Sequence, residues 1–127
     1  MIFIIDDSPY DIELTTLALE ATGREISVLS ATDAESALAM LRNRHGLPAL
    51  ILLDWKLPGM GGIEVLRKIR ADDRLRELPV VVVTSSCLES DRTEAIVAGA
   101  NDYIQKPLTL EQFSKDLESV LYQWLRN

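Results

Sequence analysis

Reactive and metal-binding side chains follow short apolar runs that are widely separated in the sequence. Three are carboxylates, one is a hydroxyl and one is an amine: Asp6, Asp7, Asp54, Thr84 and Lys106. If the apolar runs are parallel strands of one open sheet, their carboxyl ends meet at a single edge, where such sheets bind ligands. We therefore expect these five side chains to form one site.

Three converging carboxylates repel one another unless a cation lies among them. Mg²⁺ suits such a group, because it accepts one or two carboxylates and keeps waters or phosphate oxygens at its other positions. Asp6 and Asp7 are adjacent and are placed as metal ligands, whereas the central Asp54 is the candidate nucleophile. Together with Lys106 and Thr84, this set favours phosphoryl transfer to a carboxylate.

The segments that position these residues alternate between apolar runs and amphipathic stretches. Strands are expected at five runs, most of them rich in β-branched residues: 2–5, 26–29, 49–53, 79–83 and 103–104. A segment with helical periodicity follows each run. This alternation predicts an α/β fold of (βα)5 order, in which a doubly wound, five-stranded parallel sheet is covered by helices on both faces.

Capping signals predict where the helices begin. Ser8 is expected to cap the first helix, with Asp11 as an acid in its first turn, and Thr32 to cap the second. Residues 91–98 carry few large apolar side chains, so the fourth helix should be the least firmly docked. The basic residues between 67 and 76 are interspersed with acids and are predicted to form a solvated helix face.

Length and composition limit the kinds of protein to consider. A chain of 127 residues suffices for one domain with its own core, and we predict a single domain over residues 1–127. Thirteen basic against 20 acidic residues give a net charge of −7, which argues against a nucleic-acid partner. The sequence shows no membrane helix, no signal peptide and one cysteine, so we expect a cytoplasmic protein without a membrane partner.

Four fragments, IIDDS, LLDWKLPGMGG, VVVTSS and NDYIQKP, occur in this order over nearly the whole chain. Together they resemble the receiver domain of two-component response regulators, in its stand-alone, CheY-like form. The resemblance implies a flavodoxin-like fold and a phosphorelay role, in which Asp54 accepts a phosphoryl group with Mg²⁺, or alternatively Mn²⁺, bound. It also implies a phosphoacceptor that catalyses its own phosphorylation and dephosphorylation rather than an enzyme.

The resemblance assigns a role to individual residues. Four of them would bind the metal, the last through its backbone carbonyl: Asp6, Asp7, Asp54 and Lys56. Lys106 and Thr84 would contact the phosphoryl oxygens, and Tyr103 would turn inward as Thr84 follows the phosphoryl group. The Lys106–Pro107 peptide bond would be cis, an isomer confined essentially to proline. Because the Lys56 side chain adds a cation near the site, we expect a phosphoryl lifetime different from that of receivers with Asn there.

The resemblance also implies partners. A sensor histidine kinase or a phosphotransfer protein would supply the phosphoryl group. A downstream protein would bind the face formed by the fourth helix, the fifth strand and the fifth helix. A second copy of the chain is a further candidate partner, in a homodimer. Since no DNA-binding or other effector domain is recognised in the sequence, the expected output is a protein contact or a further phosphotransfer.

Other functions remain open on the residues alone. A phosphatase of the haloacid dehalogenase type uses a similar Asp, Thr and Lys set, but it expects a second Asp where this chain has Lys56. A flavodoxin-like cofactor site would need a phosphate-binding loop after the first strand, where the acidic pair repels phosphate. A third alternative is a receiver-like interaction module that is not phosphorylated.

Overall fold

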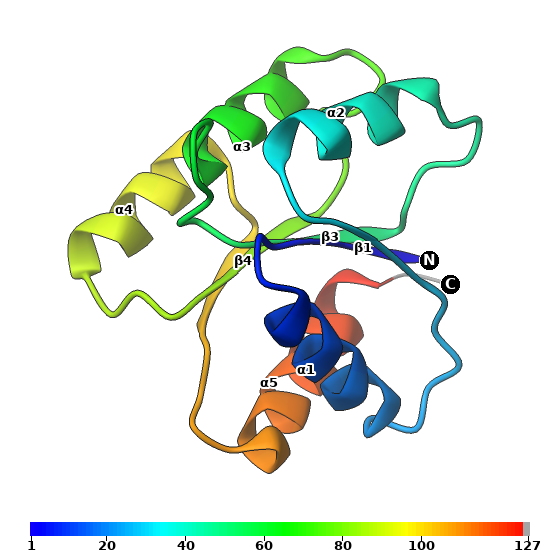
Figure 1. Cartoon of the computed structure of the whole chain (residues 1–127), viewed down its shortest axis with the longest axis vertical. Coiled ribbons are helices and arrows are strands. Elements are labelled where there is room, and N and C mark those ends of the chain that lie inside the picture. The colour runs from blue at the N-terminus through cyan, green and yellow to red at the C-terminus, as the bar shows by residue number, and fades with distance from the viewer. Residues whose placement is uncertain (126–127) are drawn as a thin grey trace.

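A computed structural model of the chain describes residues 1–125, in which strands and helices alternate (Figure 1). The strands are β1 (Ile2–Ile5), β2 (Val28–Ala31), β3 (Leu50–Leu53), β4 (Val80–Thr84) and β5 (Asp102–Gln105). The helices are α1 (Pro9–Glu20), α2 (Ala34–Asn43), α3 (Gly62–Ala71), α4 (Glu89–Ala98) and α5 (Leu110–Trp124). The predicted (βα)5 order is therefore confirmed.

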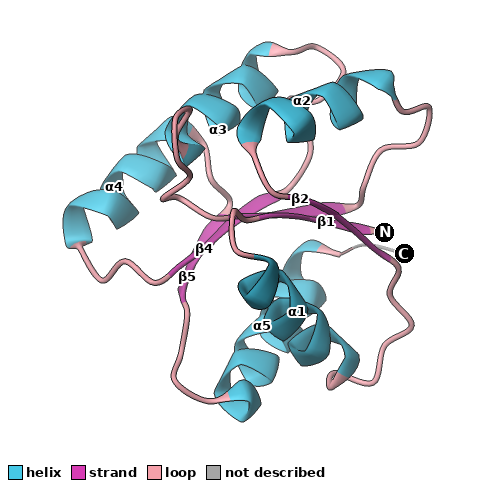
Figure 2. Ribbon diagram, in the orientation of Figure 1, coloured by secondary structure: helices cyan, strands magenta, loops and turns pink. Residues whose placement is uncertain are grey.

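The five strands form one parallel sheet with the order β2-β1-β3-β4-β5. Helices α1 and α5 cover one face, whereas α2, α3 and α4 cover the other (Figure 2). Strand β1 lies between β2 and β3 with Ile5 opposite Leu53, so the residues after these two strands emerge side by side. The chain adds β2 on one side of β1 and the later strands on the other side, beginning with β3. In a doubly wound sheet, ligands bind at this change of direction, between β1 and β3.

The central strands are buried on both faces, as their nearly continuous apolar sequences require. Successive side chains of a strand point to opposite faces. Phe3 and Ile5 accordingly pack with α2 and α3, whereas Ile2 and Ile4 pack with α1 and α5. The apolar clusters on the two faces hold the sheet between them, and this fixes the positions of the strand ends at which the polar residues lie.

The structure shifts several predicted strand and helix boundaries by one or two residues. Strand β2 begins at Val28, two residues later than predicted. Helix α2 is capped by Asp33 rather than by Thr32, because the Asp33 carboxylate accepts the Ser36 backbone N–H at 2.7 Å. The cap of α1 is as predicted: the Ser8 hydroxyl oxygen accepts the Asp11 N–H at 3.2 Å.

Helix α4 is weakly anchored in the core, as predicted, because Ala95 is its one buried residue. Its carboxyl end is held by Arg70, which the sequence analysis wrongly placed on a solvated face. The Arg70 guanidinium donates to the Gly99 carbonyl at 2.9 and 3.0 Å and to the Leu78 carbonyl at 2.7 Å. Hydrogen bonds from charged donors are stronger than those between neutral groups, so Arg70 fastens α4 to α3.

None of the helices in the described part of the chain combines the length and the apolar character that crossing a membrane requires.

Candidate functional site

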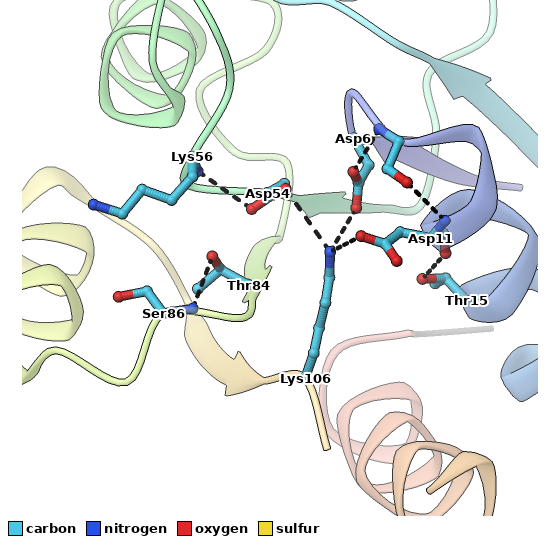
Figure 3. Close-up of polar contacts among 9 residues, drawn as sticks. Asp6, Asp11, Thr15, Asp54, Lys56, Thr84, Ser86 and Lys106 are labelled. Atoms are coloured by element: carbon cyan, nitrogen blue, oxygen red, sulfur yellow. Dashed lines mark hydrogen bonds and ion pairs between the residues drawn. The ribbon is translucent and has the colours of Figure 1, made fainter. Parts of the chain in front are cut away.

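The predicted site residues lie together at the carboxyl ends of the central strands (Figure 3). Asp6 and Asp54 follow β1 and β3, and Thr84 ends β4; all three are buried. The backbone hydrogen bonds between β1 and β3 extend to the site, since the Asp54 N–H donates to the Ile5 carbonyl at 2.9 Å. The rigid sheet therefore holds Asp6, Asp54 and Thr84 at one edge.

Three carboxylates form a cluster suited to a divalent cation. One oxygen each from Asp6, Asp7 and Asp54 lies within 4.8 Å of the others. Asp6 and Asp54 are buried, but Asp7 is exposed, which leaves one side open for waters or a phosphoryl oxygen. The all-oxygen donor set and this open side fit Mg²⁺ or Mn²⁺. The Lys56 N–H donates to Asp54 at 3.2 Å, so the Lys56 backbone lies beside the cluster.

Lys106 extends into the same site from the end of β5. Its ammonium lies 2.8 Å from Asp6 Oδ2, 3.1 Å from Asp11 Oδ2 and 3.8 Å from Asp54 Oδ2. The Lys106 backbone N–H donates to the Thr84 carbonyl at 2.8 Å, which ties the lysine to the end of β4. One cation is thus shared among three carboxylates, and Asp11 is a member that the sequence analysis assigned only to the first turn of α1.

The pKa values at the site reflect the competition between burial and charge. Burial raises the pKa of Asp6, and the hydrogen bonds from Lys106 and from the Ser8 N–H offset only part of that rise. Burial alone would lower the pKa of Lys106, but the hydrogen bond to Asp6 and the charges of Asp54 and Asp6 outweigh it. The pKa of Lys106 is therefore raised, and the amine is charged at neutral pH.

Tyr103 is turned inward in this structure, with 8% of its surface exposed. Its hydroxyl donates to the Ser86 carbonyl at 3.3 Å, and the Arg92 guanidinium lies 5.8 Å from the centre of its ring. The inward position is the one that the resemblance describes for this aromatic side chain. Whether Thr84 and Tyr103 move together stays a prediction.

The two residues after Asp54 both contact α4, a relationship that the sequence did not reveal. The Lys56 ammonium lies 2.9 Å from Asp91 Oδ2, and the Trp55 indole N–H donates to Glu94 at 3.2 Å. In Figure 3 the Lys56 side chain points away from Lys106 and the carboxylates. The charge predicted to lie near the site is therefore paired with Asp91 on α4.

The Lys106–Pro107 peptide bond is trans, which corrects the predicted cis bond, since residues 1–125 contain no cis peptide. The trans isomer is the intrinsically favoured one even before proline, by about 0.5–1 kcal/mol.

A family model described as the response regulator receiver domain matches residues 2–118 of the chain. The chain belongs to this receiver family. The receiver is 36% identical over 120 residues to the phosphate regulon transcriptional regulatory protein PhoB of Pseudomonas aeruginosa. That match covers 94% of the receiver and 51% of PhoB, so the receiver spans about half the length of this relative.

Two solved structures resemble the receiver over almost its whole length. The crystal structure of the phosphorylated cyanobacterial phytochrome response regulator RcpA matches with a TM-score of 0.87 and 34% identity, covering 98% of the receiver and 92% of RcpA. The Mn²⁺-bound form of response regulator Rcp1 matches with a TM-score of 0.84 and 30% identity, covering 99% and 94%. These matches confirm the CheY-like, flavodoxin-like fold and support a phosphoacceptor role in two-component signalling.

Proposed function

We propose that the receiver is a phosphorelay regulator whose phosphoacceptor is Asp54. The observation that carries the proposal is the buried Asp54 carboxylate, 3.8 Å from the Lys106 ammonium and clustered with Asp6 and Asp7. An Asp54 oxygen attacks the phosphorus of a phosphohistidine on the donor protein. The new O–P bond forms as the P–N bond breaks, and the electron pair of the broken bond stays on the imidazole nitrogen.

The proposed metal ligands are the three clustered carboxylates and the Lys56 backbone carbonyl. A bound Mg²⁺ or Mn²⁺ would neutralise charge on the phosphoryl oxygens during transfer. The geometry of the cluster supports this assignment, because two ligands are fixed by the strands and Asp7 borders the open side. The Mn²⁺-bound form of the related Rcp1 supports it independently.

Lys106 and Thr84 are proposed to bind the phosphoryl oxygens once they are attached to Asp54. The Lys106 ammonium already lies near Asp54, and the buried Thr84 carries a hydroxyl donor at the same edge of the sheet. Both groups are held before the reaction begins, so they stabilise the transferred charge with little rearrangement. Movement of Thr84 towards the phosphoryl group, accompanied by Tyr103, is the proposed signal to the distal face.

The proposed donors are a sensor histidine kinase or a phosphotransfer protein. The proposed output is a protein contact on the face made by α4, β5 and α5, with either a downstream protein or a second copy of the chain. We further propose that residues 1–127 act as one receiver unit in the cytoplasm. In this scheme the chain catalyses only its own phosphorylation and dephosphorylation, and it turns over no separate substrate.

Intact mass spectrometry after incubation with Mg²⁺ and acetyl phosphate tests the proposal. The expected result is a single phosphoryl adduct that requires Mg²⁺ and is absent from Asp54→Asn. Asp73→Asn is the matched control, because the Asp73 side chain is almost fully exposed just beyond the carboxyl end of α3 and the substitution removes the same charge. An adduct that persists in Asp54→Asn, or none in the wild-type protein, would contradict the proposal.

A further inference from the structure

Asp11 contacts Lys106 from the first turn of α1. Its Oδ2 lies 3.1 Å from the Lys106 ammonium, and about a third of the side chain is exposed. Of the three carboxylates that the described structure places around this ammonium, Asp6 and Asp54 belong to the metal cluster and Asp11 does not. Asp11 can therefore bind Lys106 whether or not a cation occupies the cluster.

The backbone of Asp11 is fixed on both sides. Its N–H donates to the Ser8 hydroxyl at 3.2 Å, and its carbonyl accepts from the buried Thr15 hydroxyl at 2.9 Å. An acid at this helix position commonly accepts the N–H of the capping residue. Here Asp6 accepts the Ser8 N–H instead, at 3.0 Å. The Asp11 carboxylate is thus released from capping and points at Lys106 (Figure 3).

Packing alone does not hold the Lys106 ammonium in place. The lysine and Asp11 both line a cavity of about 260 Å³ that Leu14, Pro107 and Phe113 also border. A lysine stem is flexible and has room to move beside such a cavity. The ion pairs therefore decide where the ammonium lies, and a fixed carboxylate on α1 restricts it to the side of the cluster that faces this helix.

We propose that Asp11 is a positioning residue of the phosphoryl-transfer site. Its carboxylate keeps hold of the Lys106 ammonium when a divalent cation binds Asp6, whose Oδ2 the ammonium contacts at 2.8 Å in this structure. The proposal rests on the function proposed above. Without the Asp11 charge, Lys106 would be balanced by Asp6 and Asp54 alone, and its ammonium would compete directly with the cation for their oxygens. The loss of the Asp11 negative charge would also weaken the electrostatic attraction between the cluster and the divalent cation.

The test compares Mg²⁺ binding in the wild-type protein, Asp11→Asn, Asp11→Glu and Glu13→Gln. Glu13 is an exposed acid on the same helix, and its replacement removes one charge without touching Lys106. Calorimetric titration with MgCl₂ measures the affinity directly. We expect Asp11→Asn to weaken Mg²⁺ binding roughly three- to tenfold, as a partly exposed ion pair allows, with partial recovery in Asp11→Glu and no change in Glu13→Gln.

The rate of adduct formation with acetyl phosphate gives a second readout. At subsaturating Mg²⁺, Asp11→Asn should form the Asp54 adduct more slowly than the wild-type protein, and thermal unfolding of each variant shows whether it is folded. Wild-type affinity and rate in Asp11→Asn, or equal losses in Asp11→Asn and Glu13→Gln, would overturn the proposal. Failure of the wild-type protein to form any adduct would instead refute the proposed function, while the Mg²⁺ titration would still test Asp11.

Discussion

Lys56, the second residue after Asp54, forms a 2.9 Å ion pair with Asp91 on α4. Asp91 also accepts the Ser86 hydroxyl at 2.5 Å, and Ser86 in turn accepts the Tyr103 hydroxyl through its carbonyl. The loop that carries the phosphoacceptor is thus connected to a helix that has a single residue in the core.

Replacing Lys56 with Met should loosen α4. The methionine keeps much of the side-chain length but cannot pair with Asp91, and α4 has little apolar burial to compensate. We expect severalfold faster amide hydrogen exchange in α4. Lys115→Met is the control, because Lys115 pairs with Glu111 on the exposed surface of α5. Equal exchange rates in α4 of Lys56→Met and wild-type protein would refute this prediction.

Replacing Lys56 with Asn should alter the lifetime of the phosphoryl group on Asp54. The shorter amide cannot reach Asp91, so the loop after Asp54 should open more readily and admit the water that hydrolyses the phosphoryl group. We expect faster loss of the adduct mass after the phosphodonor is removed. A decay rate that matches the wild-type rate would contradict the prediction.

The attachment of α4 should depend on pH through Asp91. The Ser86 hydroxyl and then the Lys56 ammonium hydrogen-bond the carboxylate and lower the pKa of Asp91 below its ordinary value of 3.8. A carboxylate whose pKa is lowered on folding stabilises the fold above its ordinary pKa, and this stability is lost as pH falls through the folded value. Trp55 emission, which reports on the contact with Glu94, should therefore change below pH 3.8 in the wild-type protein. The same step should be missing in Asp91→Asn, and its presence there would exclude Asp91 as the cause.

Gly62 should not tolerate a side chain. A Cβ at this position would lie 2.8 Å from both the Asp54 carbonyl oxygen and the Trp55 Cα, and neither backbone atom can move without displacing the phosphoacceptor. Gly62→Ala should destabilise the protein by about 1–3 kcal/mol, the usual range for overpacking, and reduce adduct formation. Urea unfolding measures the first effect. Gly61→Ala is the matched control, because its Cβ would meet no atom within 4 Å; a similar loss in both variants would disprove the steric explanation.

Arg70 should contribute strongly to stability. Arg70→Met would leave the Gly99 and Leu78 carbonyls without their charged donor, at a cost of about 2–3 kcal/mol in urea unfolding. The exposed Arg67, one turn earlier on α3, provides the comparison, and Arg67→Met should cost less than about 0.5 kcal/mol. If the two variants unfold at the same urea concentration, Arg70 does not anchor α4.

The sequence alone predicted the order of the elements and most of the site. The apolar runs could each be recognised as strands because a parallel sheet buries its central strands on both faces. Asp6 and Asp54 could be brought together, although they are 48 positions apart in the printed sequence, because the carboxyl ends of parallel strands share one edge. The order of the motifs supplied the family, which the comparison with known receivers confirmed.

The tertiary structure alone decided which side chains the cations contact. Lys56 pairs with Asp91, Lys106 with Asp11, and Arg70 with carbonyl groups rather than with solvent. These contacts depend on how each helix packs on the sheet and on which rotamer a long side chain adopts, and neither is encoded in local spacing. The same limit applies to the cap of α2 and to the isomer of the Lys106–Pro107 bond. In both cases the two alternatives have similar intrinsic energies, and the surrounding structure selects one of them.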